Sequence, residues 1–204
     1  MLKAIIFDMD GLMVDTEPLS RQAWDSVLNT FGYTLSDEVY LQMIGRRSRE
    51  SVQIAWNAYP LPISAEELLA RKTAVFETHL LQNTPIMPGL MELHAEIAKR
   101  QIPWAVATSS PRHHAETILT QLELTNSCHA IAAGDEVVYS KPAPDIYFLA
   151  AQRLGIAPEN CLALEDSVPG SQAAVAAGMT TIAIPNGDTR ASRFPHIHHV
   201  QVGS

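Results

Sequence analysis

The chain has 204 residues, of which 47% are hydrophobic and 18% are charged, and its net charge at pH 7 is -8. No apolar run approaches the ~18 residues that a membrane-spanning helix needs, and no basic and apolar leader opens the chain, so we expect a cytoplasmic protein without membrane contact. The negative charge and the lack of a basic stripe argue against nucleic acid as a partner, because clustered Lys and Arg residues bind the phosphate backbone.

The first predicted element is a buried strand at Lys3 to Phe7, because Ala4 to Phe7 are consecutive apolar residues. Asp8 and Asp10 follow directly. Residues i and i+2 of an extended segment point the same way, so the two carboxylates start on one side of the chain. Their mutual repulsion predicts a cationic group between them.

Residues 16–82 show a helical pattern with no convincing strand. Thr16 is suited to cap the first helix, which Gly32 is expected to end. Ser36, Ser48 and Ser64 are expected to precede or begin three further helices, and Ser64 has capping-box spacing to Glu67.

From residue 89 onward the pattern alternates between helices and strands. The predicted helices are 89–99, a segment after Pro111, 144–154 and 168–177, and the predicted strands are 104–107, 130–133, 161–164 and 181–184. Such alternation predicts a parallel sheet with right-handed crossovers. The fold class is therefore α/β, a Rossmann-like parallel sheet into which an all-helical block is inserted after the first strand.

Polar side chains follow each of the first four strands, where parallel-sheet proteins bind their ligands. They are Asp8 and Asp10, then Thr108, Ser109 and Ser110, then Lys141, and finally Glu165 and Asp166. Any one of these would by itself be a helix cap, a turn residue or a surface lysine. Together they are the groups that Mg²⁺-dependent phosphoryl transfer needs, namely hard oxygen ligands and a cation that neutralises the transferring group.

Four segments carry a resemblance to a known family: "DMDGLMVDTEP", "VATSS", "SKPAPDIY" and "ALEDSVPGSQAAVAAGM". They resemble the four motifs of the haloacid dehalogenase-like hydrolase superfamily, in its branch of small-molecule phosphatases and β-phosphoglucomutases. The resemblance implies a core domain at residues 1–15 and 86–204 and a movable helical cap at residues 16–85, hinged near residues 15–18 and 83–88.

The resemblance also implies roles for the acidic residues. Asp8 matches the nucleophile that forms an aspartyl phosphate, and Asp10 matches the general acid and base. Asp8, the backbone carbonyl of Asp10 and Asp166 would hold Mg²⁺. Glu165 would orient metal-bound water or serve as a further ligand.

The same resemblance assigns groups that bind the phosphate and the substrate. The hydroxyl of Thr108, the amide of Ser109 and Lys141 would hold the phosphoryl oxygens, with Ser110 beside them. Gly11 would permit a tight departure from the strand, where a side chain would crowd the phosphate. Within the cap segment "MIGRRSRES", Arg46 or Arg47 is expected to reach the substrate.

The predicted function is a Mg²⁺-dependent phosphatase of small phosphorylated metabolites such as sugar phosphates, acting as a monomer. Three alternatives stay open: a β-phosphoglucomutase-type mutase, a phospho-accepting receiver domain, and a binding protein on the same fold. Against the mutase, the resembling mutases carry a histidine where this chain has Ser20. In those mutases the histidine helps to keep the general acid and base inactive until a sugar substrate closes the cap, so its absence favours hydrolysis.

The remaining histidine clusters carry weaker signals. His113 and His114 are expected on the first turn of the helix after Pro111. His196, His198 and His199 lie near the C-terminus without an acidic or cysteine partner nearby, so we expect a solvated tail and no metal site there.

Overall fold

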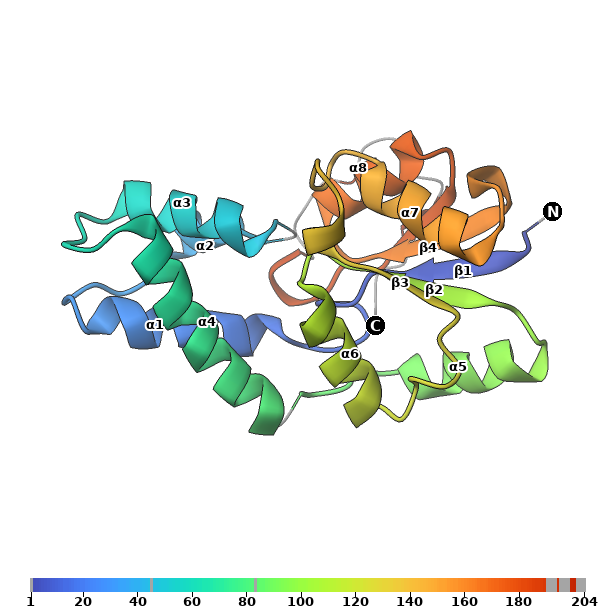
Figure 1. Ribbon diagram of the computed structural model, residues 1–204, viewed down its shortest axis with the longest axis horizontal. Helices are drawn as coiled ribbons and strands as arrows, with labels where there is room; N and C mark the ends of the chain where they lie inside the picture. The colour runs from blue at the N-terminus through green and yellow to red at the C-terminus, as the bar shows by residue number, and fades with distance from the viewer. Residues whose placement is uncertain (1, 45, 83, 190–193, 195–198, 201–204) are drawn as a thin grey trace.

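The computed structural model describes residues 2–44, 46–82, 84–189, 194 and 199–200 (Figure 1). Its centre is a six-stranded, entirely parallel sheet in the order β3-β2-β1-β4-β5-β6. The strands are β1 (Ala4–Phe7), β2 (Trp104–Ala107), β3 (Ala130–Ala132), β4 (Cys161–Glu165), β5 (Thr180–Ala183) and β6 (His199–Val200). The predicted α/β class with a parallel sheet is confirmed.

Two layers of helices cover the sheet, one on each face (Figure 1). Helices α5 (Leu90–Lys99) and α6 (Arg112–Gln121) lie on one face, and α7 (Asp145–Leu154) and α8 (Val168–Ala176) lie on the other. Side chains alternate along β1 accordingly: Ile5 and Phe7 join the core under α5 and α6, whereas Ala4 and Ile6 join the core under α7 and α8. Short 3₁₀ turns occur at Gly134–Glu136, Pro158–Asn160 and Gly187–Thr189.

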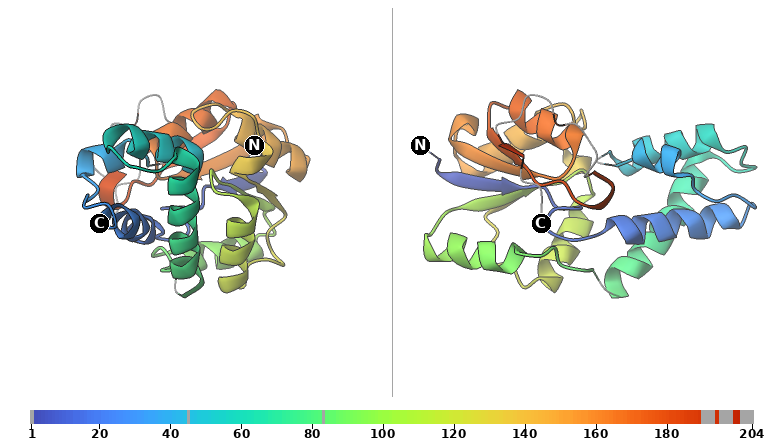
Figure 2. Two further views of the ribbon diagram at one scale, coloured as in Figure 1. Left: turned by 60° about the vertical axis from the view of Figure 1, so that its left-hand side comes forward. Right: turned by 180° about the vertical axis from the view of Figure 1, so that it is seen from behind.

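Four helices inserted between β1 and α5 form a separate bundle beyond the carboxyl ends of the strands (Figure 2). They are α1 (Glu17–Asn29), α2 (Asp37–Leu41), α3 (Ser48–Ala58) and α4 (Ala65–Gln82), and we call them the helical insertion. The insertion has its own hydrophobic core, which includes Trp24, Leu28, Tyr40 and Leu68. The predicted all-helical block is confirmed, with Ser36 capping α2 and Ser64 capping the first turn of α4.

The two chain segments that join the insertion to the sheet run side by side. The Asp15 amide donates to the Pro85 carbonyl at 2.8 Å, and the Met87 amide donates to the Met13 carbonyl at 3.0 Å. Val14 forms an isolated β-bridge with Ile86. The segment that leads into the insertion and the segment that leads out of it are thus hydrogen-bonded to each other as a narrow two-stranded ribbon.

Two local expectations from the sequence differ from the structure. Helix α1 ends at Asn29, before Gly32, and Thr16 makes no capping hydrogen bond, because its hydroxyl donates to Asp10. Near the C-terminus, His199 belongs to β6, which pairs with β5, although a solvated tail was expected. His196 and His198 lie outside the described residues.

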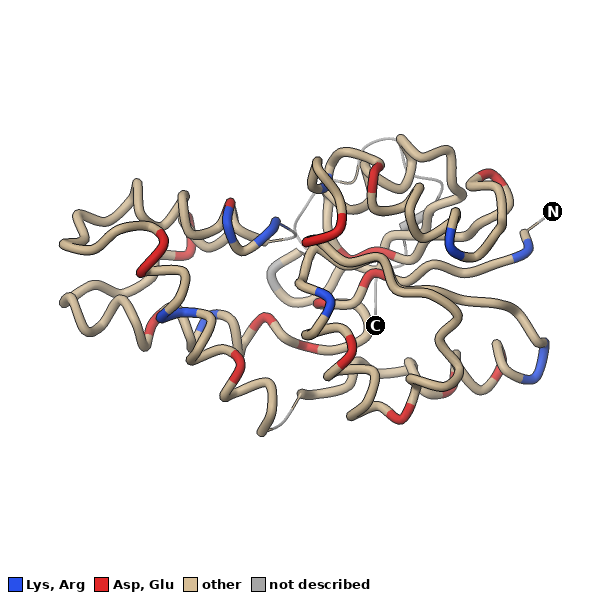
Figure 3. The backbone as a smooth tube through the Cα atoms, in the orientation of Figure 1, with Lys and Arg blue, Asp and Glu red and all other residues tan. Residues whose placement is uncertain are grey.

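Acidic and basic residues are interspersed along the elements of both the sheet region and the helical insertion (Figure 3). None of the helices among the described residues is long and apolar enough to cross a membrane.

Candidate active site

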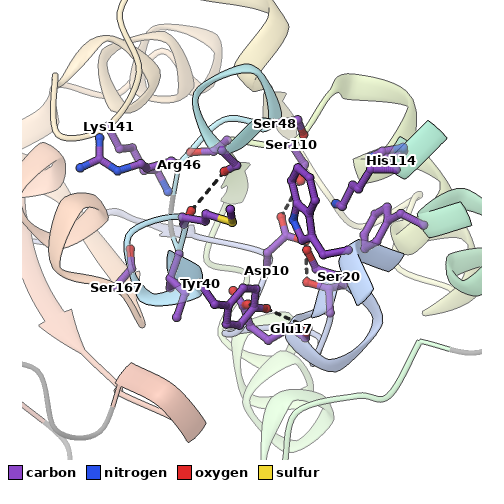
Figure 4. Close-up of a pocket in the computed structure, with 18 of the residues that line it drawn as sticks. Asp10, Glu17, Ser20, Tyr40, Arg46, Ser48, Ser110, His114, Lys141 and Ser167 are labelled. Atoms are coloured by element: carbon purple, nitrogen blue, oxygen red, sulfur yellow. Dashed lines mark hydrogen bonds between the residues drawn. The ribbon is translucent and has the colours of Figure 1, made fainter. Parts of the chain in front are cut away.

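The carboxyl ends of the central strands and the helical insertion enclose a pocket (Figure 4). The sheet region contributes Asp8, Asp10, Ser109, Ser110, Lys141, Asp166 and Ser167 to its lining. The structure therefore brings together side chains that are separated by more than 100 positions in the sequence, as expected for strands that end at one edge of a parallel sheet.

Lys141 places a cation between Asp8 and Glu165, whereas the sequence predicted one between Asp8 and Asp10. Its Nζ lies 2.6 Å from Asp8 Oδ1, 2.6 Å from Glu165 Oε1 and 3.1 Å from the Ala107 carbonyl. All three charged side chains are at least nine-tenths buried. The pKa of Lys141 is raised by Asp8 and Glu165, although burial opposes the shift, so the lysine is charged.

Even with this lysine, the site carries an excess of negative charge. Burial raises the pKa of Asp8 to about 8; Lys141 opposes this shift, and Glu165 and Asp10 add to it. Burial and the neighbouring charges of Asp8 and Glu165 likewise raise the pKa of Asp166 well above its usual range. Oxygens of Asp8, Glu165 and Asp166 lie within 4.8 Å of one another. Such clustered carboxylate oxygens fit a divalent cation with hard oxygen ligands, which would let them ionise together.

Asp10 is surrounded by hydroxyl groups. Its Oδ1 accepts a hydrogen bond from Thr16 at 2.8 Å, and its Oδ2 accepts from Thr108 at 2.9 Å and from Ser110 at 2.8 Å. The position of Ser110 is fixed in turn because its amide donates to the Thr108 hydroxyl at 3.0 Å. The hydroxyls that follow β2 thus hold the Asp10 carboxylate in place, and Ser109 lines the pocket beside them.

Gly11 makes the tight turn that was expected after the first strand. Its φ of +86° is a conformation that favours glycine. A Cβ at this position would lie 2.3 Å from Asp166 Oδ2. A side chain at Gly11 would therefore displace a carboxylate of the acidic cluster, and the expected crowding of the phosphate stays a prediction.

Glu165 is fully buried and engaged by protein donors on both oxygens. Its Oε1 accepts from Lys141 and from the Tyr147 hydroxyl at 2.7 Å, and its Oε2 accepts from the amide and hydroxyl of Ser167 at 3.2 and 3.1 Å. A Cβ at Gly170 would lie 1.8 Å from Oε1. In this arrangement Glu165 positions Lys141, and a role toward a metal stays a prediction.

The two candidate arginines of the insertion point to different places. Arg46 lines the pocket, near Lys141 in the close-up (Figure 4), and its Nε donates to the Gln42 carbonyl at 2.8 Å. The Arg47 guanidinium instead donates to the carbonyls of Val137 and Val138 at 2.8 and 3.1 Å. Arg47 thus contacts the loop after β3, and the alternative that it reaches into the pocket does not match this structure.

The insertion supplies a wall of the pocket, as expected of a cap, but of its residues only Ser20 and Arg46 were singled out as functional residues from the sequence. Glu17, Ser20, Tyr40, Lys72 and Phe76 line it. Lys72 is buried, and its ammonium group lies 4.3 Å from the ring centroid of Phe76. Burial lowers the pKa of Lys72 to about 8, although nearby acidic groups raise it in part.

A signal for Lys72 was present in the sequence. The buried residues Leu68, Lys72, Phe76 and Leu80 follow one another at intervals of four along α4, so the lysine stands on the apolar face of the helix. A lone lysine on such a face indicates a buried charge with a function or a partner. No comparable signal identified Tyr147 or Thr16, whose contacts arise only on folding.

Comparison with known proteins shows which family the chain is similar to. Residues 2–178 match the family described as haloacid dehalogenase-like hydrolase. The phosphorylated carbohydrates phosphatase of Thermotoga maritima is 34% identical over 185 residues, covering 89% of this chain and 84% of the relative. Hexitol phosphatase B of Escherichia coli K12 is 35% identical over 188 residues, covering 89% of this chain and 83% of the relative.

A solved structure shows the same similarity in three dimensions. The crystal structure of CbbY from Rhodobacter sphaeroides in complex with phosphate superimposes with a TM-score of 0.88 at 30% identity, covering 98% of this chain and 94% of that one. The relatives are named as phosphatases, which agrees with the predicted enzyme class of phosphoric monoester hydrolase. The chain belongs to the haloacid dehalogenase-like hydrolases.

Proposed function

We propose that this protein is a Mg²⁺-dependent phosphatase that hydrolyses monophosphates of sugars or sugar alcohols. The observation that carries the proposal is the pairing of a buried, lysine-contacted Asp8 with a second carboxylate, Asp10, two residues away at the same pocket. Nucleophilic catalysis on phosphorus needs an anionic nucleophile and a separate group that transfers protons.

In this mechanism Asp8 attacks the phosphorus atom and forms an aspartyl phosphate while the alcohol leaves. Asp10 protonates the leaving oxygen and then accepts a proton from the water that hydrolyses the intermediate. Thr16, Thr108 and Ser110, which donate to Asp10 in the structure, keep its carboxylate at a defined place. Lys141 and Ser109 neutralise and bind the phosphoryl oxygens, whereas the Thr108 hydroxyl, which the sequence also assigned to them, donates its single proton to Asp10.

The acidic cluster is the proposed site of the metal. Asp8, Asp166 and the backbone carbonyl of Asp10 would hold Mg²⁺. Glu165 would not need to bind the ion directly, because it fixes the position of Lys141 beside Asp8. When bound, this ion neutralises charge on the phosphoryl group and on the carboxylates. The raised pKa values of Asp8 and Asp166 support the proposal, because they report burial and crowding of negative charge that a divalent cation would neutralise, which would let both groups ionise.

The helical insertion is proposed as the cap that covers the substrate, with core residues 1–15 and 86–204 and cap residues 16–85. The contacts of Arg47 with Val137 and Val138 tie the insertion to the loop after β3. Closure of this kind excludes water and strengthens the electrostatic contacts beneath. The pairing of ribbon residues Asp15 and Pro85 supports a hinge at that point.

The proposed substrate class rests on the part of the pocket lining that the insertion contributes. Glu17, Ser20, Lys72 and Arg46 offer hydrogen-bonding and charged groups, and Phe76 offers an apolar ring. Several polar groups around one ring surface suit a polyhydroxylated carbon chain. The relatives named for phosphorylated carbohydrates and for hexitols support the same class.

A phosphate-release assay tests the proposal. The protein is incubated with a panel of sugar, sugar-alcohol and nucleoside monophosphates in Mg²⁺ or in EDTA, with Asp8→Asn as the blank. We expect Mg²⁺-dependent release from one or more sugar or sugar-alcohol phosphates and none from the blank. Full activity in EDTA, or equal activity of Asp8→Asn, would contradict the mechanism.

A further inference from the structure

Two groups of three side chains, among the residues that the structure describes, bring possible metal-ligand atoms within 4.8 Å of one another. One is the acidic cluster of the active site. The other consists of Glu77, His113 and His114, and the proposed catalytic mechanism makes no use of it. Glu77 belongs to α4 of the helical insertion, whereas both histidines belong to the first turn of α6.

The geometry of the second cluster resembles three corners of a metal site. Glu77 Oε1 lies 3.0 Å from His113 Nε2 and 3.2 Å from His114 Nε2. Imidazole nitrogens and carboxylate oxygens bind Zn²⁺ at ~2.0 to 2.2 Å, so neighbouring ligands of a tetrahedral ion lie on the order of 3.3 Å apart. The two separations from Glu77 are close to that spacing, and the third, between the two imidazole nitrogens, is at most 4.8 Å, so side-chain adjustments would let an ion enter.

The protonation and exposure of these groups also suit a metal. Burial lowers the pKa of His114, which favours the neutral imidazole that binds metals. Hydrogen bonds from the two histidines lower the pKa of Glu77, so this carboxylate is ionised. The side chains of His113 and Glu77 are 62% and 41% exposed, which leaves an entry path from solvent, while that of His114 is 6% exposed.

We propose that Glu77, His113 and His114 bind a divalent transition-metal ion such as Zn²⁺, with a solvent molecule as the fourth ligand. Two nitrogen ligands select Zn²⁺ or Co²⁺ over Mg²⁺, which takes oxygen ligands. Each imidazole would bind through Nε2, and its single proton, which faces Glu77 from Nε2 without the metal, would then stand on Nδ1. The site is therefore chemically distinct from the acidic cluster around Asp8.

A metal at this place joins the two parts of the molecule. Helices α4 and α6 lie side by side, where the Gln121 side chain also donates to the Leu80 carbonyl at 3.0 Å (Figures 1 and 2). His114 contacts Phe76 of α4 and lines the pocket. The bound ion would hold the insertion against the sheet region. It would slow turnover by hindering the movement of the insertion away from the pocket. This effect on turnover rests on the proposed function, whereas metal binding itself does not.

The test is a titration with Co²⁺, whose visible absorption reports nitrogen and oxygen coordination, in excess Mg²⁺ and without substrate. The variants are Glu77→Gln and His113→Ala. The matched controls, Glu66→Gln and His129→Ala, remove the same chemical groups from exposed positions elsewhere. Far-UV circular dichroism verifies that each variant is folded.

We expect the wild type and both controls to bind one equivalent of Co²⁺ with an intense visible band, and both test variants to lose that equivalent. Zn²⁺ should displace Co²⁺ and abolish the band. Equal Co²⁺ uptake and equal spectra in the wild type and in Glu77→Gln and His113→Ala would overturn the proposal. This readout needs no turnover, so its failure is distinguishable from a failure of the proposed phosphatase activity.

Discussion

Lys141 Nζ lies 2.6 Å from Asp8 Oδ1, and both side chains are buried at the carboxyl edge of the sheet. A second carboxylate, Glu165, contacts the same nitrogen at 2.6 Å and is held from its other side by Ser167. The lysine is thus fixed between two carboxyl groups, one of which belongs to the side chain that we propose as the nucleophile. Catalysis and stability should both depend on it.

Substitution of Lys141 by Met keeps the length of the side chain but removes its charge. We expect kcat to fall by roughly 100- to 1,000-fold, the scale observed when one electrostatic donor is removed from an active site. We also expect a lower thermal midpoint, since Asp8 and Glu165 would then be buried without their cation. Steady-state kinetics and thermal unfolding measure both effects, and wild-type kcat in a folded Lys141→Met protein would refute the role.

Substitution of Asp8 by Asn should abolish turnover and yet stabilise the metal-free protein. Because the pKa of Asp8 is raised from 3.8 to about 8, the folded state binds a proton more tightly than the unfolded state does. Stability is therefore lost as the pH rises from about 4 toward 8, and the amide removes this loss. Thermal midpoints in EDTA should fall less steeply with pH in Asp8→Asn than in the wild type or in the control Asp145→Asn.

His94 should make the fold sensitive to mild acid. It is buried between Phe7 and Trp104, with ring centroids 5.1 and 4.4 Å away, and burial lowers its pKa below 6.5. The unfolded state takes up a proton first, so stability is lost as the pH falls below about 6.5. His94→Phe should flatten the dependence of the unfolding free energy on pH between 6.5 and 5, as measured by urea denaturation. An unchanged slope would show that His94 does not cause it.

Lys72 should act on substrate binding. Lys72→Met removes the ammonium group that lies over Phe76 in the pocket wall, so we expect KM to rise about tenfold or more with a smaller change in kcat. Arg71→Met is the matched control, since Arg71 pairs with Glu67 at an exposed position of the same helix. If both variants leave KM unchanged, Lys72 does not contact the substrate.

The protein should release phosphate and not act as a mutase. The proposed reason is that Ser20, which lines the pocket, stands where the resembling mutases have a histidine that delays the general acid and base. With β-glucose 1-phosphate and a trace of the 1,6-bisphosphate, we expect free phosphate to exceed glucose 6-phosphate. Isomerisation that outruns phosphate release by about a hundredfold would reverse this assignment.

The sequence by itself determined the parallel sheet, the place of the helical insertion and the residues that end each strand. These are local properties: apolar runs such as Ala4 to Phe7, turn residues, and the two-residue spacing of Asp8 and Asp10 need no knowledge of the rest of the chain. Because parallel strands share one carboxyl edge, the convergence of Lys141 and Asp166 with this pair also followed from topology alone.

Only the tertiary structure decided which partner each side chain meets. The Thr16 hydroxyl contacts Asp10 although its position suited a helix cap, and adjacent Arg46 and Arg47 face the pocket and a core loop respectively. The contact of Glu77 with His113 joins α4 and α6, and no periodic pattern in the sequence predicts that these two helices lie together. Such contacts depend on how whole helices pack against the sheet. A shift of about one ångström in that packing is enough to form or break a hydrogen bond, and the spacing of residues in the sequence does not specify packing so finely.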